Sequence, residues 1–427
     1  MGSISGEMLE FINESPCAFF VVKNLKNRLL EEGFEELLEN EEWSVKDGGR
    51  YFTVRDSSSI IAFKIPHDEI YSYHAVLTHA DSPALKLKPD FEIDCTGMKK
   101  LSCDKYGGLI LDSFFDIPLS VAGRVVIATD NGIVEKLVNL ENVAIIPRTP
   151  PHLSKEQGMN TAVDMLPLYS AIGKSSLKNR IANALNIEEN AILSHDLYVV
   201  PSSKGTLWGE NDEFITSPRL DNLQSVFTSL VGFLNSDENI CVPVMAVFDS
   251  EEIGSGGENG AASSYLSDTL LRISKSMRLS DTEHMKALSN SFFASVDSTH
   301  ALHPNHPELF DKTNTPIINS GIAIKYSAAK RYTTSAVSAG LFMKIASLAQ
   351  VPCQSFSTRS DLQGGSTLGH ISQEKVPVLS VDIGAPILSM HSSSETAGTL
   401  DTQHLARAIE MFYSVIVERI GDTHIIK

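Results

Sequence analysis

The sequence predicts an α/β protein whose central mixed sheet is flanked by helices and whose chain is interrupted by a smaller, β-rich inserted domain. The 427 residues exceed what a single core usually holds. Strand-like and helix-like patterns alternate in the C-terminal half. The middle of the chain instead has short strand-like runs separated by Pro and Gly. We therefore expect one domain made of residues 1–85 and 218–427, with residues 86–217 inserted into it.

The elements of this framework follow from the spacing of apolar residues. Helices are indicated by apolar residues three or four positions apart, and buried strands by short runs rich in Ile, Val and Phe. The predicted helices cover residues 19–30, 223–234 and 405–416. The strand-like runs are Ser59–Ile65, His74–Leu77, Gly108–Leu111, Arg124–Ala128, Val242–Phe248, Ser291–Val296 and Val378–Ile383.

Composition and charge exclude several classes of protein. Hydrophobic residues are 42% and charged residues 21% of the chain, which excludes disordered, collagen-like and coiled-coil proteins. The 35 basic and 53 acidic residues give a net charge of −18, so we expect neither a nucleic acid nor an anionic membrane as partner. No apolar run approaches the roughly 20 residues that span a bilayer. The five scattered cysteines form no C-x-x-C pair, which favours a reduced, cytoplasmic protein.

Acidic and histidine residues recur where a predicted strand ends or a helix begins. Seven residues hold such positions: His79, Asp81, Asp221, Glu251, Glu252, Asp297 and His391. Ligands of open α/β sheets bind at the carboxyl ends of the strands, so these side chains converge if their elements share one sheet. Histidine and carboxylate ligands without a thiolate suit zinc, manganese or cobalt. Five ligands exceed what one catalytic metal needs, which favours two ions that share one carboxylate and acidify a common water.

Each of these residues also has a purely structural interpretation. Asp221 could be an ordinary helix N-cap, and a single histidine near a strand is usually a core or surface residue. Glu251 and Glu252 could be solvated loop residues. The glycines from Gly254 to Gly260 resemble a phosphate-binding loop but lack its lysine, so we interpret them as a tight turn. The recurrence at strand ends is what favours the metal site.

Six short motifs occur in order along the chain: His79–Pro83, Ser217–Asn222, Asp249–Ser255, Asp297–Asn305, Gly365–Gly369 and Met390–Ser392. Shorter matches are Ser15-Pro16, Gly33-Phe34, Gly48–Tyr51, Tyr106–Gly108 and Ala122–Val125. In these motifs, and along nearly all its length, the sequence resembles the aspartyl aminopeptidase family of metallo-aminopeptidases. The resemblance implies a catalytic α/β domain interrupted by a dimerisation domain, and homo-oligomers in which dimers assemble into a tetrahedral dodecamer.

The resemblance also implies a role for each polar residue at the strand ends. Asp221 would bridge two divalent ions, zinc in the first place, with manganese or cobalt as alternatives. The remaining ligands would be His79 and Asp297 on one ion and Glu252 and His391 on the other. Glu251 would be the general base, and Asp81 would orient His79.

The implied substrate is a peptide with a free N-terminus, from which one residue is removed. Members of the family often prefer Asp or Glu at that position, and an acidic side chain needs a cation in its pocket. Lys325 matches the family position that meets this side chain, and Tyr332 follows close behind it. Gly365 and Ser366 are further substrate-binding candidates. His152 falls in the loop by which a neighbouring subunit approaches the site.

Departures from the family pattern keep other functions open. Ser250 stands where many members have His, Ser394 replaces an Arg, and Gln363–Thr367 replaces a Pro-Cys-Gly-Ser-Thr pattern. The alternatives are an aminopeptidase that prefers neutral residues such as leucine, a dinuclear deacylase or carboxypeptidase, and a non-catalytic assembly or binding protein. The last has no need of a proton acceptor, so the presence of Glu251 beside all five ligands argues against it.

Overall fold

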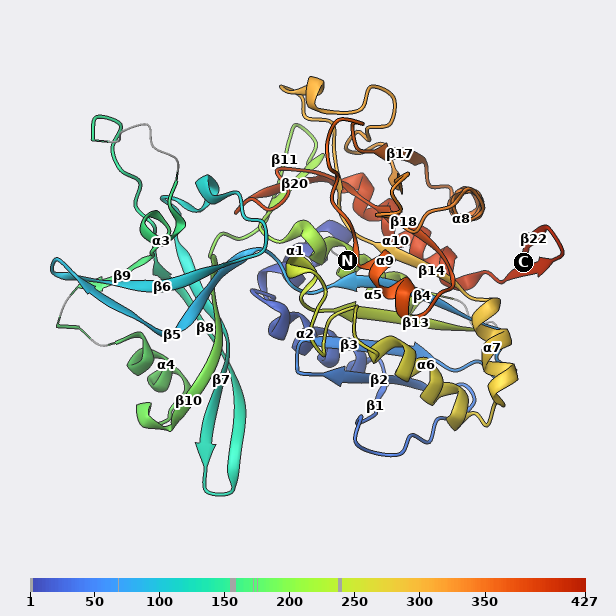
Figure 1. The fold of residues 1–427 in the computed structure, drawn as a ribbon, viewed down its shortest axis with the longest axis horizontal. Coiled ribbons are helices and arrows are strands. Elements are labelled where there is room, and N and C mark those ends of the chain that lie inside the picture. Colours follow the sequence, from blue (N-terminus) through green and yellow to red (C-terminus); the bar gives the residue numbers. More distant parts are fainter. Residues whose placement is uncertain (1–2, 68, 154–158, 172, 175, 237–239) are drawn as a thin grey trace.

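The computed structural model describes residues 3–67, 69–153, 159–171, 173–174, 176–236 and 240–427 (Figure 1). The described helices are α1 (Ile4–Asn13), α2 (Ala18–Glu31), α3 (Thr161–Asp164), α4 (Leu177–Leu185), α5 (Leu220–Asn235), α6 (Tyr265–Ser276), α7 (Asp281–Ser289), α8 (Ala336–Leu348), α9 (Leu368–Lys375) and α10 (Thr399–Ser414). None of them is both long enough and apolar enough to cross a membrane.

The largest sheet is mixed, as predicted. Its strands, in spatial order, are β1 (Glu35–Glu36), β2 (Arg50–Arg55), β3 (Ser59–Lys64), β13 (Cys241–Phe248), β4 (Ser72–His79), β14 (Phe292–Val296), β18 (Leu379–Gly384), β16 (Ile322–Tyr326) and β17 (Cys353–Ser357). The central strands β13, β4, β14 and β18 are parallel, whereas β3 and β16 are antiparallel to their inner neighbours. Phe248 pairs with His79 and Val296 with Ile383, so the carboxyl ends of these four strands lie at one edge.

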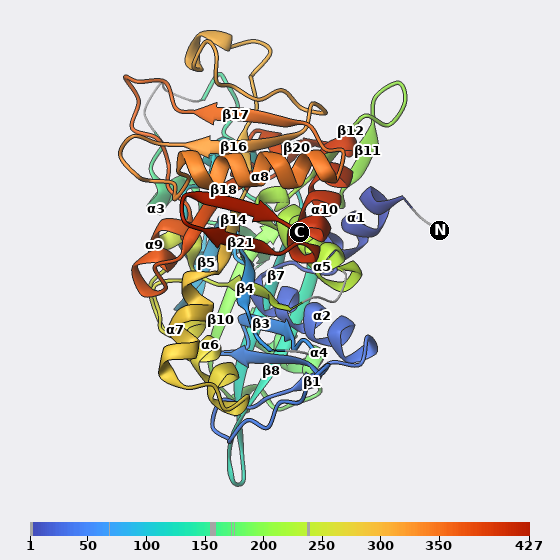
Figure 2. The same ribbon diagram turned by 90° about the vertical axis from the view of Figure 1, so that its right-hand side faces the viewer.

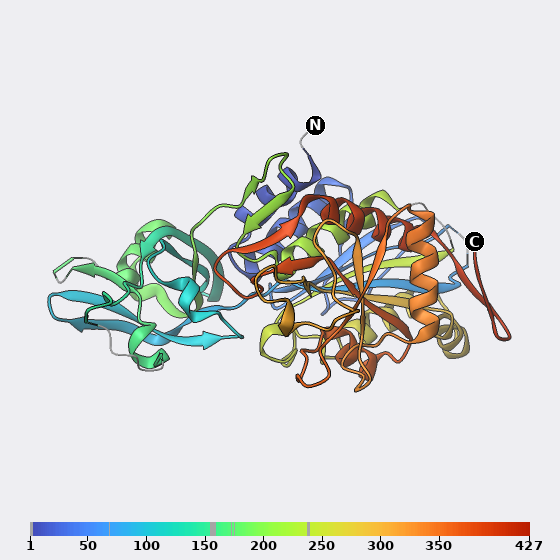
Figure 3. The same cartoon turned by 90° about the horizontal axis from the view of Figure 1, so that it is seen from above.

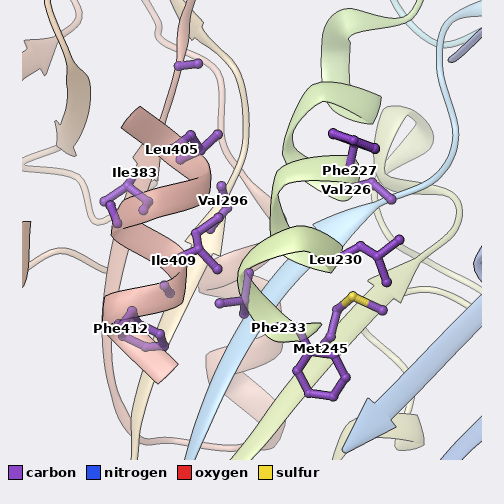
Figure 4. Close-up of a cluster of buried hydrophobic side chains, with 14 of the residues drawn as sticks. Val226, Phe227, Leu230, Phe233, Met245, Val296, Ile383, Leu405, Ile409 and Phe412 are labelled. Carbon is purple, nitrogen blue, oxygen red and sulfur yellow. The ribbon is translucent and has the colours of Figure 1, made fainter. Parts of the chain in front are cut away.

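Helices cover both faces of this sheet and bury its apolar side chains. Figure 2 shows α6, α7 and α9 on the opposite side of the sheet from α2, α5 and α10. On the second side, α5 and α10 present Phe233, Ile409 and Phe412 to the strands, and all three are buried (Figure 4). Each such side chain contributes about 1.5–3 kcal/mol to folding. The predicted helical stripe at 223–234 is therefore the inward face of α5, and the stripe at 405–416 is that of α10 up to Ser414, where the helix ends before Val415 and Ile416.

The middle of the chain forms a sheet of its own, between β4 and β13 in the sequence. Its strands, in spatial order, are β8 (Gly132–Ala144), β7 (Leu119–Thr129), β10 (Ile192–Pro201), β5 (Ala84–Cys95), β6 (Met98–Tyr106) and β9 (Leu168–Ala171). This six-stranded sheet has a separate apolar core, to which α4 adds Leu177 and Ile181. It lies beside the rest of the molecule rather than within the larger sheet (Figure 3).

The segment after β10 returns to the rest of the chain. A third sheet has the strand order β11 (Thr206–Trp208), β12 (Phe214–Ser217), β20 (Glu395–Gly398), β19 (Pro386–Leu388) and β15 (Thr299–His300). Ser217 pairs with Glu395, so residues 206–217 join the C-terminal part although the sequence assigned them to the insertion. We propose that the insertion ends near Pro201, because β12 pairs with β20 of the C-terminal part. The sequence placed this boundary too late, because backbone pairing with a strand almost 180 residues away leaves no local signal. A C-terminal hairpin consists of β21 (Val417–Ile420) and β22 (Thr423–Ile426).

One predicted strand is wrong. Gly108–Leu111 is an irregular segment that leads into a short 3₁₀ helix at Leu111–Phe114. Its backbone bonds to the loop that contains His391: the amide of Ile110 donates to the carbonyl of His391, and the carbonyl of Gly108 faces the His391 ring. A Cβ at Gly108 would lie 3.1 Å from Nδ1 of that ring, so this close approach favours glycine.

Candidate active site

Three strand ends deliver polar side chains to the same edge of the large sheet. His79 is the last residue of β4, Asp297 follows β14, and Glu251 and Glu252 lie in a short 3₁₀ turn three residues after β13. Because these strands are parallel neighbours in register, their ends are side by side. Ligand atoms of His79, Glu251 and Glu252 lie within 4.8 Å of one another, although His79 is far from the two glutamates in sequence.

Asp221 lies between two histidines and connects two groups of ligand atoms. Its Oδ1 is 3.6 Å from Nε2 of His79, and its Oδ2 is 3.5 Å from Nε2 of His391. The first group is completed by Asp297, whose Oδ1 is 3.5 Å from Nε2 of His79. The second is completed by Glu252, whose Oε2 is 3.4 Å from Nε2 of His391. Each group therefore has one histidine, one carboxylate of its own and one oxygen of the shared Asp221.

The structural interpretation of Asp221 as a helix N-cap does not hold. The start of α5 is kinked at Asp221 and Asn222, and among the described residues no amide of the helix donates a hydrogen bond to the Asp221 side chain, as an N-cap requires. The Asp221 backbone amide donates to Oε2 of Glu395 at 2.9 Å. Its side chain is buried, yet Oδ1 has no hydrogen-bond partner among the described residues. A buried carboxylate oxygen without a donor is costly unless a cation satisfies it.

Both histidines turn the same ring nitrogen toward the cluster. Nδ1 of His79 is 3.0 Å from the carbonyl oxygen of Asp81, and Nδ1 of His391 is 3.0 Å from the carbonyl oxygen of Gly108. A carbonyl oxygen only accepts hydrogen bonds, so in each ring the Nδ1 proton points away from the cluster. Nε2 of each ring then faces the carboxylates, and a metal ion that displaces the Nε2 proton would find the arrangement of a metal-ligating histidine.

The Asp81 carboxylate holds the turn that contains Glu251 and Glu252. Its Oδ1 accepts the amide of Glu251 and its Oδ2 the amide of Glu252, both at 3.1 Å. Tyr106 donates its hydroxyl to Oδ2 at 2.9 Å. Asp81 therefore contacts His79 on one side and this turn on the other.

Three residues of the site had no role assigned from the sequence. Glu395 accepts the amides of both Asp221 and His391, Tyr106 donates to Asp81, and Asn222 donates to the carbonyl of Val296. Tyr106 and Asn222 lie in motifs noted above, and Glu395 is four residues after His391. Their positions in those motifs were the available signal, but hydrogen bonds to backbone groups of distant segments leave no pattern in the sequence.

The carboxyl groups and histidines of the cluster shift one another's pKa values. Burial raises the pKa of Glu251 to about 7, and Asp297 adds to the increase while His79 opposes it. Burial also raises the pKa of Glu252, with Asp221 as the main neighbouring charge. Burial alone would lower the pKa of His391, but Asp221 and Glu252 raise it to about 10. Metal cations bound at this cluster would lower the pKa values of the carboxyl groups and displace the protons from the histidine Nε2 atoms.

The donor set fits two divalent ions. Two imidazole nitrogens and three carboxylates, with no thiolate nearby, are ligands that zinc accepts. The unpartnered oxygen of Asp221 and the two inward Nε2 atoms are the groups that such ions would satisfy. The His391 side chain is 28% exposed, so the cluster can be reached from solvent on that side.

Comparison with known proteins gives the family. The model of the family described as Aminopeptidase I zinc metalloprotease (M18) matches residues 11–413. The probable M18 family aminopeptidase 2 of Clostridium novyi (strain NT) is 38% identical over 426 residues, which cover 96% of this chain and 98% of that relative. The chain belongs to the M18 family of zinc aminopeptidases. It is therefore a metal-dependent peptide hydrolase, as the sequence motifs predicted.

Solved structures agree with this M18 assignment. The cryo-EM structure of the Ape4 and Nbr1 complex superposes with a TM-score of 0.93 at 32% identity, covering 96% of this chain and 85% of that one. The structure of the S. cerevesiae mApe1 dodecamer gives a TM-score of 0.84 at 22% identity, covering 96% of each chain. The second likeness shows the fold alone.

In this M18 aminopeptidase, the candidate substrate residues occupy different environments. Lys325 on β16 is buried, and its Nζ donates to the carbonyl of Ser298 at 2.8 Å and lies 3.5 Å from Oδ2 of Asp297. Burial lowers its pKa, but Asp297 and other nearby groups more than offset this, so that the pKa is raised. The ammonium is 5.6 Å from the centre of the Tyr332 ring.

The other candidate substrate residues are exposed. Gly365 and Ser366 lie in a loop before α9, and His152 lies in an exposed turn after β8. Among the described residues, no contact joins His152 to the metal-ligand cluster. Its predicted approach to the site therefore requires a second subunit and stays a prediction.

Proposed function

We propose that this chain is a dinuclear zinc aminopeptidase that removes acidic residues from the N-termini of peptides. The observation that carries the proposal is the position of Asp221, which has one carboxylate oxygen within 3.6 Å of each inward-facing histidine nitrogen. One ion would be held by His79, Asp221 and Asp297, and the other by Asp221, Glu252 and His391. The bound ions would polarise the scissile carbonyl and lower the pKa of a water molecule.

Glu251 would move the proton in this reaction. Its carboxylate lies among the cluster ligands but is not needed as a ligand in either group of three. It would take a proton from the attacking water and give it to the amine nitrogen of the leaving peptide. The Asp81 carboxylate holds the Glu251 amide at 3.1 Å, which fixes where this proton acceptor stands.

An N-terminal amine is the substrate group that we expect the site to recognise. A neutral amine nitrogen can ligate zinc, and its N–H groups can donate to a carboxylate such as that of Glu251. Lys325 supports the acidic preference, because it is a buried cation within 3.5 Å of the ligand Asp297. A charge-assisted contact to a substrate carboxylate would then select Asp or Glu.

We further propose a homo-oligomer in the cytoplasm. One protein of the same fold, S. cerevesiae mApe1, has been solved as a dodecamer. An oligomer would allow His152 of one subunit to approach the site of another. All five cysteines are free, which supports a reducing compartment.

Hydrolysis of Asp-, Glu-, Leu- and Ala-anilides by zinc-loaded protein tests this function. We expect turnover of Asp and Glu substrates that a chelator abolishes and zinc restores, because the hydrolytic water needs the metal. An N-acetyl amino acid serves as the control for a deacylase. Higher turnover of Leu than of Asp would contradict the acidic preference, and turnover of only the acetylated compound would contradict the aminopeptidase proposal.

Lys325→Met should reduce turnover of acidic substrates selectively. The substitution keeps most of the buried volume and removes the charge. We expect kcat/KM for Asp-anilide to fall about 10- to 100-fold more than for Leu-anilide, because a hydrogen bond to a charged group contributes about 1.5–3 kcal/mol. Lys344→Met, an exposed lysine on α8, is the matched control. Equal losses for both substrates would mean that Lys325 only neutralises Asp297.

A further inference from the structure

A cation of the six-stranded sheet reaches the turn between β2 and β3. Arg124 on β7 donates Nε to Oδ2 of Asp196 at 2.9 Å. Its other two nitrogens bind the carboxylate of Asp56, Nη1 to Oδ1 at 2.7 Å and Nη2 to Oδ2 at 3.3 Å. The Arg124 side chain is only 14% exposed and lies against the Phe19 ring, 4.6 Å from its centre. This two-pronged contact fixes the guanidinium in both position and plane.

Asp56 connects Arg124 to the end of β13. The side-chain amide of Asn259 donates to Oγ of Ser58 at 2.8 Å and lies 3.4 Å from Oδ2 of Asp56. The same nitrogen is 3.1 Å from Oδ2 of Asp249, the first residue after β13. A continuous set of polar contacts therefore runs from Arg124 through Asp56 and Asn259 to Asp249.

Asp249 in turn shapes the turn that contains Glu251. Its Oδ1 accepts the amide of Ser250 at 2.7 Å, and Ser250 has a left-handed backbone with φ of 64°. The next amide, that of Glu251, is held by Asp81. The backbone is thus fixed at two consecutive amides. Asp249, which is connected to Arg124, holds the amide of Ser250, and Asp81 holds the amide of Glu251.

We propose that Arg124 is a positioning residue that sets the location of Glu251 through Asp56, Asn259 and Asp249. This inference rests on the proposed role of Glu251 as proton acceptor. Arg124 lies on the six-stranded sheet, whereas the turn lies on the nine-stranded sheet, so the contacts make the turn depend on how the two sheets sit together. A partly buried ion pair is weak evidence for stability but is well suited to fixing one arrangement.

The neighbouring Lys86 provides a matched control. Its Nζ lies 2.8 Å from Oδ1 of Asp196, so it pairs with the same carboxylate as Arg124. No contact of Lys86 with Asp56 or Asn259 is found in the described part of the chain. Lys86→Met therefore removes a cation from the same cluster without interrupting the path to Asp249.

The test compares Arg124→Met, Asp56→Asn and Lys86→Met in the full-length, zinc-loaded protein. We expect Arg124→Met and Asp56→Asn to lower kcat about 10- to 100-fold, with KM changed less than about twofold, because a misplaced proton acceptor slows chemistry rather than binding. Lys86→Met should leave kcat within about twofold of wild type. The kinetics are measured at saturating zinc with the zinc content of each sample determined, because the ligand Glu252 lies in the same turn as Glu251; at full zinc content the loss in kcat reports the displacement of Glu251.

Hydrogen exchange measured by mass spectrometry separates this inference from the proposed function. We expect faster exchange in residues 249–254 for Arg124→Met and Asp56→Asn, with exchange in β13 unchanged, whether or not the protein cleaves peptides. Faster exchange throughout the chain, or unchanged exchange at 249–254, would overturn the positioning role. An equal response to Lys86→Met would do the same. A wild-type protein without peptidase activity would overturn the proposed function and leave the exchange result to decide the coupling.

Discussion

Glu251→Gln should lower kcat for peptide hydrolysis by about 10²–10⁴-fold, the usual contribution of a positioned general base. The substitution keeps the size of the side chain and removes its ability to accept a proton. Glu251 is the carboxylate that neither three-ligand group around Asp221 requires. Its backbone amide bonds to Asp81, so the turn should keep its conformation. The zinc content should remain that of wild type.

The measurement combines steady-state kinetics on the anilide panel with zinc analysis of the same samples. Glu258→Gln is the matched control, because Glu258 is an exposed glutamate seven residues further along and outside the cluster. Turnover near that of wild type would remove Glu251 from the mechanism. Loss of zinc together with activity would instead make Glu251 a ligand.

Asp221→Asn should abolish binding of both ions. The carboxylate has one oxygen near each Nε2 atom, at 3.6 Å from His79 and 3.5 Å from His391. An amide keeps the shape but has one neutral oxygen, so each ion loses one of its two anionic ligands and the two ions lose the group that they share. Loss of a group that only orients a ligand already weakens metal binding about 10- to 100-fold, so we expect a larger loss here. Activity should fall to background.

Metal stoichiometry distinguishes this role from that of the other ligands. Asp297→Asn is the comparison, because Asp297 belongs to the His79 group alone. We expect Asp221→Asn to bind no zinc at a concentration that saturates wild type, and Asp297→Asn to retain the ion held by Glu252 and His391. One ion remaining on Asp221→Asn, or none on Asp297→Asn, would contradict the bridging arrangement.

Metal-free Asp221→Asn should be less stable than metal-free wild type at neutral pH. Burial alone would raise the pKa of Asp221, but His391 and His79 more than offset this and lower the pKa below its ordinary value. The folded state therefore favours the ionised carboxylate, and its loss leaves both histidines without that partner. Thermal unfolding in chelator measures this loss, and a folded baseline at the assay temperature shows that lost activity reflects lost metal rather than lost fold.

The sequence by itself determined the repeating local patterns and the list of reactive side chains. Apolar spacing predicted α5, α10 and the central strands, because burial of one face requires the same periodicity wherever the element lies. The acidic and histidine residues at strand ends identified all five ligand candidates, since parallel strands bring their carboxyl ends to one edge. The family resemblance added the division of those ligands between two ions.

Only the tertiary structure decided which distant backbone groups meet. The predicted strand at Gly108–Leu111 is an irregular segment whose Gly108 carbonyl contacts the His391 ring. Residues 206–217, predicted to lie in the insertion, instead include β12, which pairs with β20. In the folded protein, Glu395 also accepts the backbone amide of Asp221, and Arg124 donates to the carboxylate of Asp56. These contacts join residues about 70 to 280 positions apart, and many of them involve backbone amides or carbonyls, which every residue type carries. A sequence pattern reports which side chain is present, whereas the packing of the sheets decides which backbone atoms it reaches.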